Sequence, residues 1–124
     1  MLVLVEDDLV IRRLMREVFE LDGFNPIAFS NADDAWRFLQ HDAHSVSLLV
    51  TDLRMPGALK GSDLIRLSRA YFIFPIVASS GFAHAEGFDR TLVDAFVPKP
   101  WSIDQLVGAC RDALRARSFE LARS

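Results

Sequence analysis

The sequence of 124 residues contains a single cysteine, and no uninterrupted apolar run approaches the roughly 18 residues that mark a membrane span. One cysteine excludes an internal disulfide and a zinc site built from cysteines. A lone cysteine also fits a reducing compartment, so we expect a cytoplasmic location.

An excess of basic charge is also lacking, because 14 lysine and arginine residues face 17 aspartate and glutamate residues, for a net charge of −3. This balance gives no general attraction to nucleic acid or to anionic lipid. We therefore expect neither direct contact with nucleic acid nor a membrane among the partners. Hydrophobic residues make up 51% of the sequence, which is typical of one folded domain at this length.

Short apolar runs alternate along the chain with longer amphipathic stretches. Residues 9–21, for example, place Ile11, Leu14 and Val18 on one helical face. Strands are predicted at residues 2–5, 25–29, 46–50, 76–79 and 95–97, and helices at residues 9–21, 32–40, 62–71, 83–92 and 103–114, with a polar loop at 41–44. We expect one domain at residues 1–116, followed at 117–124 by a tail or an extension of the last helix.

Five strand-then-helix units in a row predict an α/β fold, with a parallel sheet covered by helices on both faces. The runs at residues 2–5 and 48–50 support this prediction, because they are continuously apolar rather than alternating. In such a sheet, ligands bind outside the carboxyl ends of the strands.

The residues at those strand ends are strongly polar. The first predicted strand is followed by Glu6, Asp7 and Asp8, and the third by Asp52. If these two strands are neighbours, their ends lie about 5 Å apart and the carboxylates crowd one pocket. A hard divalent cation, of which Mg²⁺ is the best match, would relieve the repulsion between them. Capping of the following helix accounts for Asp8 alone but not for Asp52, which precedes a loop.

Four segments in this order, LVLVEDD, VTDLRMPG, PIVASSG and FVPKP, resemble the signature of the receiver domain of two-component response regulators, the CheY-like family. The resemblance covers essentially the whole chain. It implies a single doubly wound (βα)5 domain of the flavodoxin-like type, with a five-stranded parallel sheet in the order 2-1-3-4-5.

The resemblance also implies a role for each matching residue. Asp52 is the expected phosphoacceptor, which forms a 4-aspartylphosphate with the phosphoryl group of a sensor histidine kinase or a phosphotransfer protein. The expected Mg²⁺ ligands are Glu6, Asp7, Asp52 and the backbone carbonyl of Arg54.

Ser80 and Lys99 would each contact a phosphoryl oxygen, and Ser80 and Phe96 would form the conformational switch that signals to a downstream protein partner. The peptide bond between Lys99 and Pro100 is expected to be cis. Such a domain is a phosphoacceptor with slow autodephosphorylation rather than an enzyme. The basic residues Arg12, Arg13 and Arg16 of the helix at 9–21 are expected to be solvated or to meet the kinase.

Three departures from the family pattern stand out. The loop MPGALKG after Asp52 is one residue longer than the common form, which should alter the start of the next helix. Phe96 has no hydroxyl where tyrosine is common. The segment between Ser80 and Lys99 is shorter by about one helical turn, so the helix predicted at 83–92, which contains Gly87, should be weak.

Three alternatives have different requirements. A Mg²⁺-dependent aspartyl-phosphate hydrolase would carry its acceptor at the end of the first strand, with a second aspartate two residues later as the acid and base. A flavin mononucleotide binder would need a phosphate-binding loop where this chain has three acids. A phosphorylation-independent interaction module would not need Glu6, Asp7, Asp52, Ser80 and Lys99 together.

Overall fold

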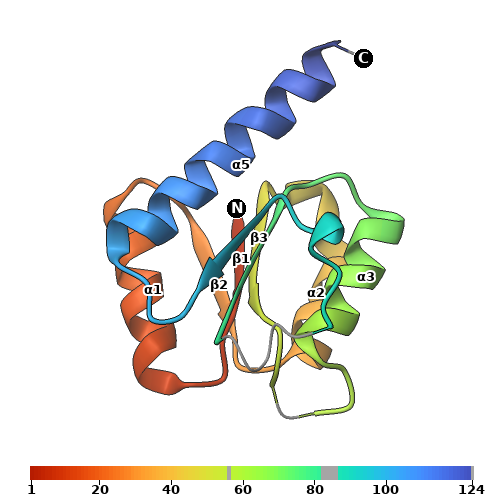
Figure 1. Cartoon of the computed structure of the whole chain (residues 1–124). Coiled ribbons are helices and arrows are strands. Elements are labelled where there is room, and N and C mark those ends of the chain that lie inside the picture. The colour runs from red at the N-terminus through yellow and green to blue at the C-terminus, as the bar shows by residue number, and fades with distance from the viewer. Residues whose placement is uncertain (56, 82–86, 124) are drawn as a thin grey trace.

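Five parallel strands form the sheet at the centre of the structure (Figure 1). Their order in the sheet is β2-β1-β3-β4-β5. The computed structural model describes residues 1–55, 57–81 and 87–123, except for the side chains of residues 119–123. The strands are β1 Leu2–Val5, β2 Pro26–Phe29, β3 Leu48–Asp52, β4 Ile76–Ser80 and β5 Ala95–Pro98. The predicted sheet order is thus confirmed.

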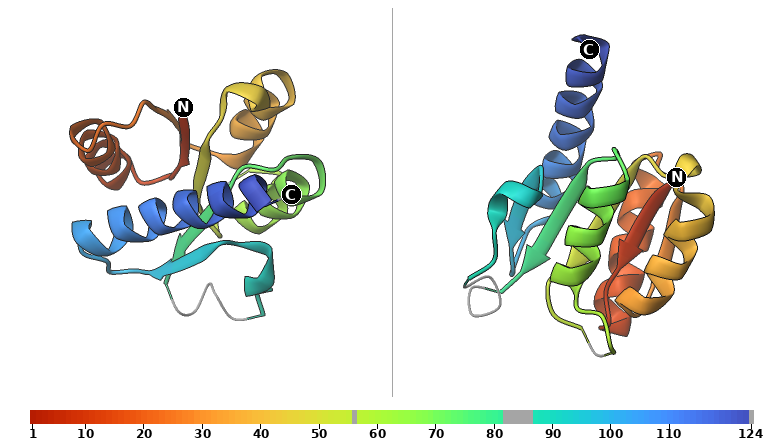
Figure 2. Two further views of the ribbon diagram at one scale, coloured as in Figure 1. Left: turned by 90° about the horizontal axis from the view of Figure 1, so that it is seen from above. Right: turned by 90° about the vertical axis from the view of Figure 1, so that its right-hand side faces the viewer.

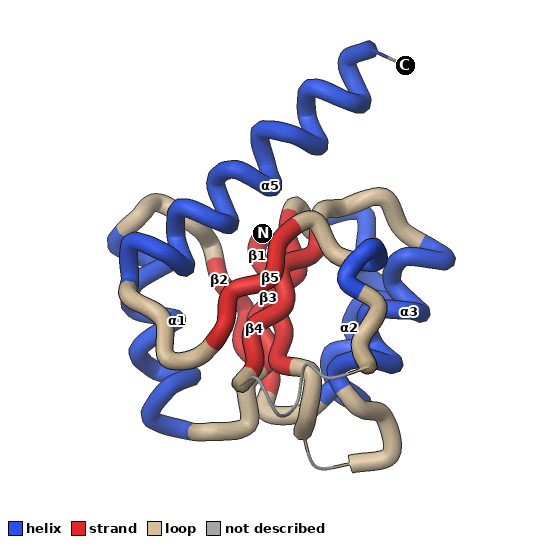
Figure 3. The backbone as a smooth tube through the Cα atoms, in the orientation of Figure 1, coloured by secondary structure: helices blue, strands red, loops and turns tan. Residues whose placement is uncertain are grey.

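The helices lie on both faces of this sheet, as predicted (Figure 3). They are α1 Leu9–Leu21, α2 Ala32–Asp42, α3 Gly61–Tyr71 and α5 Ile103–Arg123, together with the 3₁₀ helices η1 Ala43–Ser45 and η2 Arg90–Leu92. Helices α1 and α5 cover one face, and α2 and α3 cover the other. Among the described residues, no helix is long and apolar enough to cross a membrane.

The strands supply the core with side chains in two directions, because successive residues of a strand point to opposite faces. In β1, Val3 and Val5 pack with α2 and α3, whereas Leu2 and Leu4 pack with α1 and α5. All four side chains are buried. Burial of each such side chain stabilises the fold by about 1.5–3 kcal/mol, and burial on both faces explains the unbroken apolar run.

Helix starts follow the expected capping chemistry. The Asp8 carboxylate accepts hydrogen bonds from the backbone of Val10 and Ile11 at 2.9 and 3.0 Å, and Asn31 caps α2 through the N–H of Asp34. These bonds satisfy N–H groups that have no partner inside the helix.

Two predicted boundaries near the middle of the chain were wrong. Strand β3 begins at Leu48 rather than at 46 and continues through Thr51 to Asp52, because backbone pairing with β1 and β4 extends to these polar residues. The predicted polar loop at 41–44 is instead the end of α2 followed by η1, in which the Ser45 hydroxyl donates to the carbonyl of Asp42.

The prediction of a helix at 83–92 was also wrong for the described residues 87–92. Its first part, residues 83–86, lies outside the described residues. Gly87 has a φ of +78°, which is incompatible with an α-helix. The Asp89 carboxylate then accepts hydrogen bonds from the N–H and hydroxyl of Thr91, and the chain forms the short helix η2.

Helix α5 is the longest helix, and its C-terminal part projects beyond the sheet (Figures 1 and 2). Ser102 caps its start, because the Ser102 hydroxyl accepts from the Gln105 N–H and the Gln105 side chain accepts from the Ser102 N–H. Cys110 packs on its inner side and is completely buried. The helix ends at Arg123, so residues 117–123 extend it.

Candidate functional site

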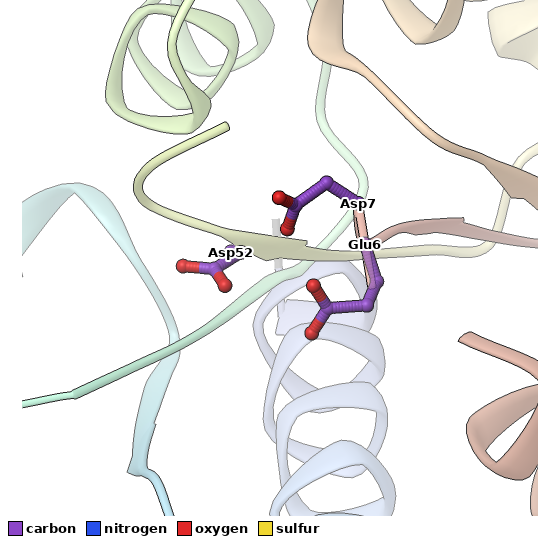
Figure 4. A group of neighbouring side chains, drawn as sticks. All are labelled: Glu6, Asp7 and Asp52. Atoms are coloured by element: carbon purple, nitrogen blue, oxygen red, sulfur yellow. The ribbon is translucent and has the colours of Figure 1, made fainter. Parts of the chain in front are cut away.

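Three carboxylates meet where β1 and β3 end (Figure 4). Glu6, Asp7 and Asp52 each offer an oxygen, and the three oxygens lie within 4.8 Å of one another. Pairing of Val5 with Thr51 aligns the two strand ends. Glu6 and Asp52 are 2% and 8% exposed, whereas Asp7 faces solvent. The sequence prediction that these acids converge agrees with this geometry.

The ammonium group of Lys99 completes the cluster. Its Nζ lies 2.6 Å from Glu6 Oε1 and 2.8 Å from Asp52 Oδ2. Lys99 directly follows the edge strand β5, and its backbone N–H donates to the carbonyl of Ser80 at 2.9 Å. The side chain therefore spans the width of β4 to reach the acids. The bond from Lys99 to Pro100 is cis, as the resemblance implied.

The charges of this cluster perturb one another. Burial raises the pKa of Glu6, although its hydrogen bond to Lys99 acts in the opposite direction. Burial alone would lower the pKa of Lys99, but the hydrogen bonds to Asp52 and Glu6 outweigh it and raise the pKa. Lys99 therefore stays cationic near neutral pH, and one cation balances only part of the charge of three carboxylates.

One further residue supports the acids, and the sequence reasoning did not assign it this role. A guanidinium nitrogen of Arg12 donates to the backbone carbonyls of Glu6 and Asp7 at 2.9 and 3.2 Å. Arg13 is exposed, and Arg16 forms an exposed ion pair with Glu20. The sequence feature that could have indicated this role is the position of Arg12 as the fourth residue of a helix that starts directly after the acids.

The remaining predicted residues lie on β4 and β5. Ser80 is completely buried, and within the described part of the chain its hydroxyl oxygen has no hydrogen-bond partner. Phe96 is half-buried against the core layer formed with α2 and α3. The guanidinium carbon of Arg90 lies 4.3 Å from the centre of its ring, which is a cation–π contact. No described hydrogen bond joins Ser80 to the acids.

The backbone after Asp52 is held closely by the start of α3. The Arg54 N–H donates to Asp52 Oδ1 at 3.3 Å. A Cβ atom at Gly61 would lie only 1.6 Å from the Asp52 carbonyl oxygen. Only glycine permits this approach, so Gly61 helps to position the end of β3. The sequence reasoning read Gly61 as part of a loop and missed this role.

The longer loop after Asp52 is anchored by a carboxylate of α2. Asp33 accepts a hydrogen bond from the N–H of Leu59 at 3.2 Å. At the end of the loop, the Asp63 carboxylate accepts from the N–H of Lys60 at 2.8 Å, and α3 begins at Gly61. These two hydrogen bonds thus hold the loop between β3 and α3.

Comparison with known proteins agrees with this geometry. The family model of the response regulator receiver domain matches residues 2–111. The chain belongs to the response regulator receiver domain family. It is therefore a receiver domain of the two-component response regulators, a family of phosphoacceptor signalling domains.

Curated relatives of this receiver domain include the transcriptional regulatory protein CpxR of Escherichia coli K12, which is 30% identical over 119 residues, or 92% of this chain and 49% of the relative. CpxR of Klebsiella pneumoniae is 29% identical over 119 residues, which again are 92% of this chain and 49% of the relative. The chain therefore spans about half the length of the curated relatives that it matches.

Solved structures show the same fold. A receiver domain protein of Clostridium thermocellum has a TM-score of 0.84 at 19% identity, with coverage of 95% of this chain and 96% of that chain. The receiver domain of NtrX from Brucella abortus has a TM-score of 0.81 at 24% identity, with coverage of 93% and 98%.

Proposed function

We propose that Asp52 is the phosphoacceptor of this receiver domain. The observation that carries the proposal is the position of Asp52 at the end of β3, hydrogen-bonded to Lys99 and within 4.8 Å of two further carboxylates. An Asp52 carboxylate oxygen attacks the phosphorus of a phosphohistidine on a sensor histidine kinase or a phosphotransfer protein. The nitrogen–phosphorus bond breaks, the imidazole leaves with the electron pair, and Asp52 becomes a 4-aspartylphosphate.

Positioning and charge neutralisation are the main contributions that a protein makes to phosphoryl transfer. Lys99 already contacts Asp52, so its ammonium group is placed to neutralise a phosphoryl oxygen there. The buried Ser80 hydroxyl, which is free to donate, contacts a second phosphoryl oxygen in this proposal. The inward movement of Ser80 and Phe96 then changes the surface that a downstream protein partner reads.

The oxygen donors of this site fit Mg²⁺, which prefers carboxylate and carbonyl ligands and retains several waters. We assign the ion to the carboxylates of Glu6, Asp7 and Asp52 and to the backbone carbonyl of Arg54. When bound, it neutralises negative charge on the transferring phosphoryl group. Arg12 holds the backbone of the first two ligands in place through their carbonyls.

The kinase or phosphotransfer protein docks, in this proposal, on an apolar depression beside the acids. The depression has a volume of about 400 Å³ and is lined by Ile11, Leu14, Lys99, Pro100 and Trp101. Leu14 is 43% exposed, so a helix that carries the phosphohistidine would gain apolar contact close to Asp52.

The limits of the domain and its location form part of the same proposal. Residues 1–116 constitute the receiver domain, and α5 continues past it through Arg123. The protein acts in the cytoplasm. Slow autodephosphorylation, by attack of water on the phosphorus of the acyl phosphate, returns the domain to its resting state.

The hydrolase alternative requires an acceptor at the end of the first strand, whereas Asp52 ends β3. No observation favours that alternative over a receiver function.

The test of the proposal is phosphorylation in vitro with acetyl phosphate, followed by intact-mass measurement. We expect one base-labile phosphoryl group in the presence of Mg²⁺, none in the presence of a chelator, and none in Asp52→Asn. Asp112→Asn, at an exposed carboxylate of α5, is the matched control and should react like the wild type. A phosphoryl group that persists in Asp52→Asn, or forms equally well with the chelator, would refute the assignment.

A further inference from the structure

A second depression lies beside the loop that follows Asp52. It has a volume of about 380 Å³ and lies between the start of α3 and the segment from Gly87 to η2. Figure 1 shows α3 and this segment on the same side of the sheet. The residues that line this second depression differ from those that line the apolar depression beside Lys99.

The floor of this depression is apolar and its rim is basic. Leu53 is buried, and Phe88 and Leu92 are half-buried against the core layer formed with α2 and α3. Three exposed cationic residues lie around this floor. We call the whole the basic groove, formed by Leu53, Phe88, Leu92, Arg54, Lys60 and Arg66.

The basic charge of the groove is only partly balanced. Arg66 forms an ion pair with Asp63, and the Lys60 ammonium lies 3.4 Å from the carbonyl of Met55. Within the described residues, the Arg54 guanidinium has no carboxylate partner. Asp89 also lines the groove and remains anionic, because the hydrogen bonds that its carboxylate accepts from Thr91 lower its pKa. Among the described residues, three cations thus face the carboxylates of Asp63 and Asp89, which leaves an excess of positive charge on a chain whose net charge is −3.

The spacing of the cations indicates the size of the ligand. Lys60 precedes α3 and Arg66 follows six positions later, which corresponds to about 9 Å along the helix at about 1.5 Å per residue. Cations distributed along this length suit a ligand with several separated anionic groups. A segment of polypeptide with several acidic residues spans this distance, and its apolar side chains have a floor on which to pack.

We propose that the basic groove binds an acidic segment of a protein partner, one that carries leucine or phenylalanine between its carboxylates. Charge complementarity gives the segment its orientation, and the apolar floor gives it contact area. Leu53 and Arg54 directly follow Asp52 in the sequence, so the partner would sit against the loop that carries the proposed phosphoacceptor. The inference concerns a different surface and holds whether or not Asp52 is phosphorylated.

The test uses the unphosphorylated chain and a short fluorescein-labelled peptide of alternating acidic and leucine or phenylalanine residues. Fluorescence anisotropy measures its affinity for the wild type and for Lys60→Gln/Arg66→Gln. Arg37→Gln/Arg115→Gln is the matched control, because it removes the same charge and, like Arg66, both residues pair with an aspartate three positions earlier.

We expect the groove variant to bind the peptide about tenfold more weakly. The loss of two exposed ion pairs between the groove and the peptide changes the dissociation constant by about this factor. The dissociation constant of the control variant for the peptide should stay within about twofold of the wild-type value. In NMR spectra, the amides of Leu53, Phe88 and Leu92 should shift on addition of the peptide.

Three results would overturn the proposal. The first is equal weakening in the groove and control variants, which would indicate unspecific charge attraction. The second is that a peptide with serine in place of leucine and phenylalanine binds the wild type as tightly as the original peptide does. The third is displacement by inorganic tripolyphosphate at the same concentration as the peptide, which would indicate a small-anion site.

Discussion

At the scale of single residues, Lys99 governs the electrostatics of the site. Two buried carboxylates, Glu6 and Asp52, depend on its ammonium group for compensation. Removal of one partner from a buried charge cluster leaves the others uncompensated and destabilises the fold. The same ammonium group competes with any cation for these carboxylates, so its effects on folding and on metal binding oppose each other.

Lys99→Ala should lower the free energy of unfolding in the absence of Mg²⁺ by about 1–3 kcal/mol, because buried acceptors lose their donor. Added Mg²⁺ should stabilise the variant more than the wild type, since a competing cation has gone. Urea unfolding with and without Mg²⁺ measures both effects. Lys60→Ala is the control, because Lys60 is exposed and its ammonium contacts only a backbone carbonyl among the described residues. Equal Mg²⁺ effects in all three proteins would contradict this explanation.

At the scale of elements, the packing of α3 against the end of β3 sets the position of Asp52. Gly61 permits the first turn of α3 to touch the Asp52 carbonyl. The Asp33 carboxylate of α2 holds the loop between them. Helix α3 thus contacts the backbone at the end of β3, and α2 holds the loop that joins β3 to α3.

Gly61→Ala should therefore destabilise the protein by about 3 kcal/mol, because a Cβ atom at 1.6 Å from the Asp52 carbonyl oxygen forces the backbone apart. Phosphorylation by acetyl phosphate should also slow, because the end of β3 moves. Gly108→Ala is the matched control in α5, where a Cβ atom meets nothing within 4 Å. It should raise stability by about 0.5–1 kcal/mol, since alanine favours a helix interior. Urea unfolding distinguishes the two, and a change of the same sign in both variants would refute the role of Gly61.

At the scale of the whole molecule, the long helix α5 is held by apolar packing and by ion pairs from Arg111 to Asp22 and from Arg117 to Asp94. Its inner side packs on the sheet through Leu106, Cys110 and Ala113. Further along, the Arg117 guanidinium lies 3.0 Å from a carboxylate oxygen of Asp94, just before β5. Asp94 also contacts the Arg69 guanidinium of α3 at 2.7 Å, so one carboxylate links helices on opposite faces of the sheet.

The ionisation and reactivity of the Cys110 thiol indicate whether α5 stays packed on the sheet. Burial, with a smaller effect of Asp22, raises the pKa of its thiol from 9.0 to about 12. A raised pKa in the folded state means that this contribution to stability is complete below about pH 9 and is lost as the pH rises toward 12. Urea midpoints should therefore fall more steeply over this range in the wild type than in Cys110→Ala. A thiol reagent at neutral pH should react with the folded wild type only after unfolding, and rapid reaction of folded protein would show that α5 detaches.

Much of the architecture was determined by local sequence pattern. Continuous apolar runs indicated buried parallel strands, and the strand–helix alternation indicated the layers. Asp8, Asn31 and Ser102 cap helix starts, because their side chains bond to backbone groups only a few residues away. The convergence of Glu6, Asp7 and Asp52 was also predictable, because parallel strands bring their carboxyl ends to one edge of the sheet.

Tertiary structure decided what depends on distant partners. Thr51 and Asp52 belong to β3 because β1 and β4 pair with them, although their side chains are polar. The role of Arg12 depends on two carbonyls outside its helix, and that of Gly61 on contact with Asp52. The basic groove combines side chains of α3 with residues near η2, which lie more than twenty positions away in the sequence. A local pattern records which faces are apolar, but only the packed chain determines which atoms meet.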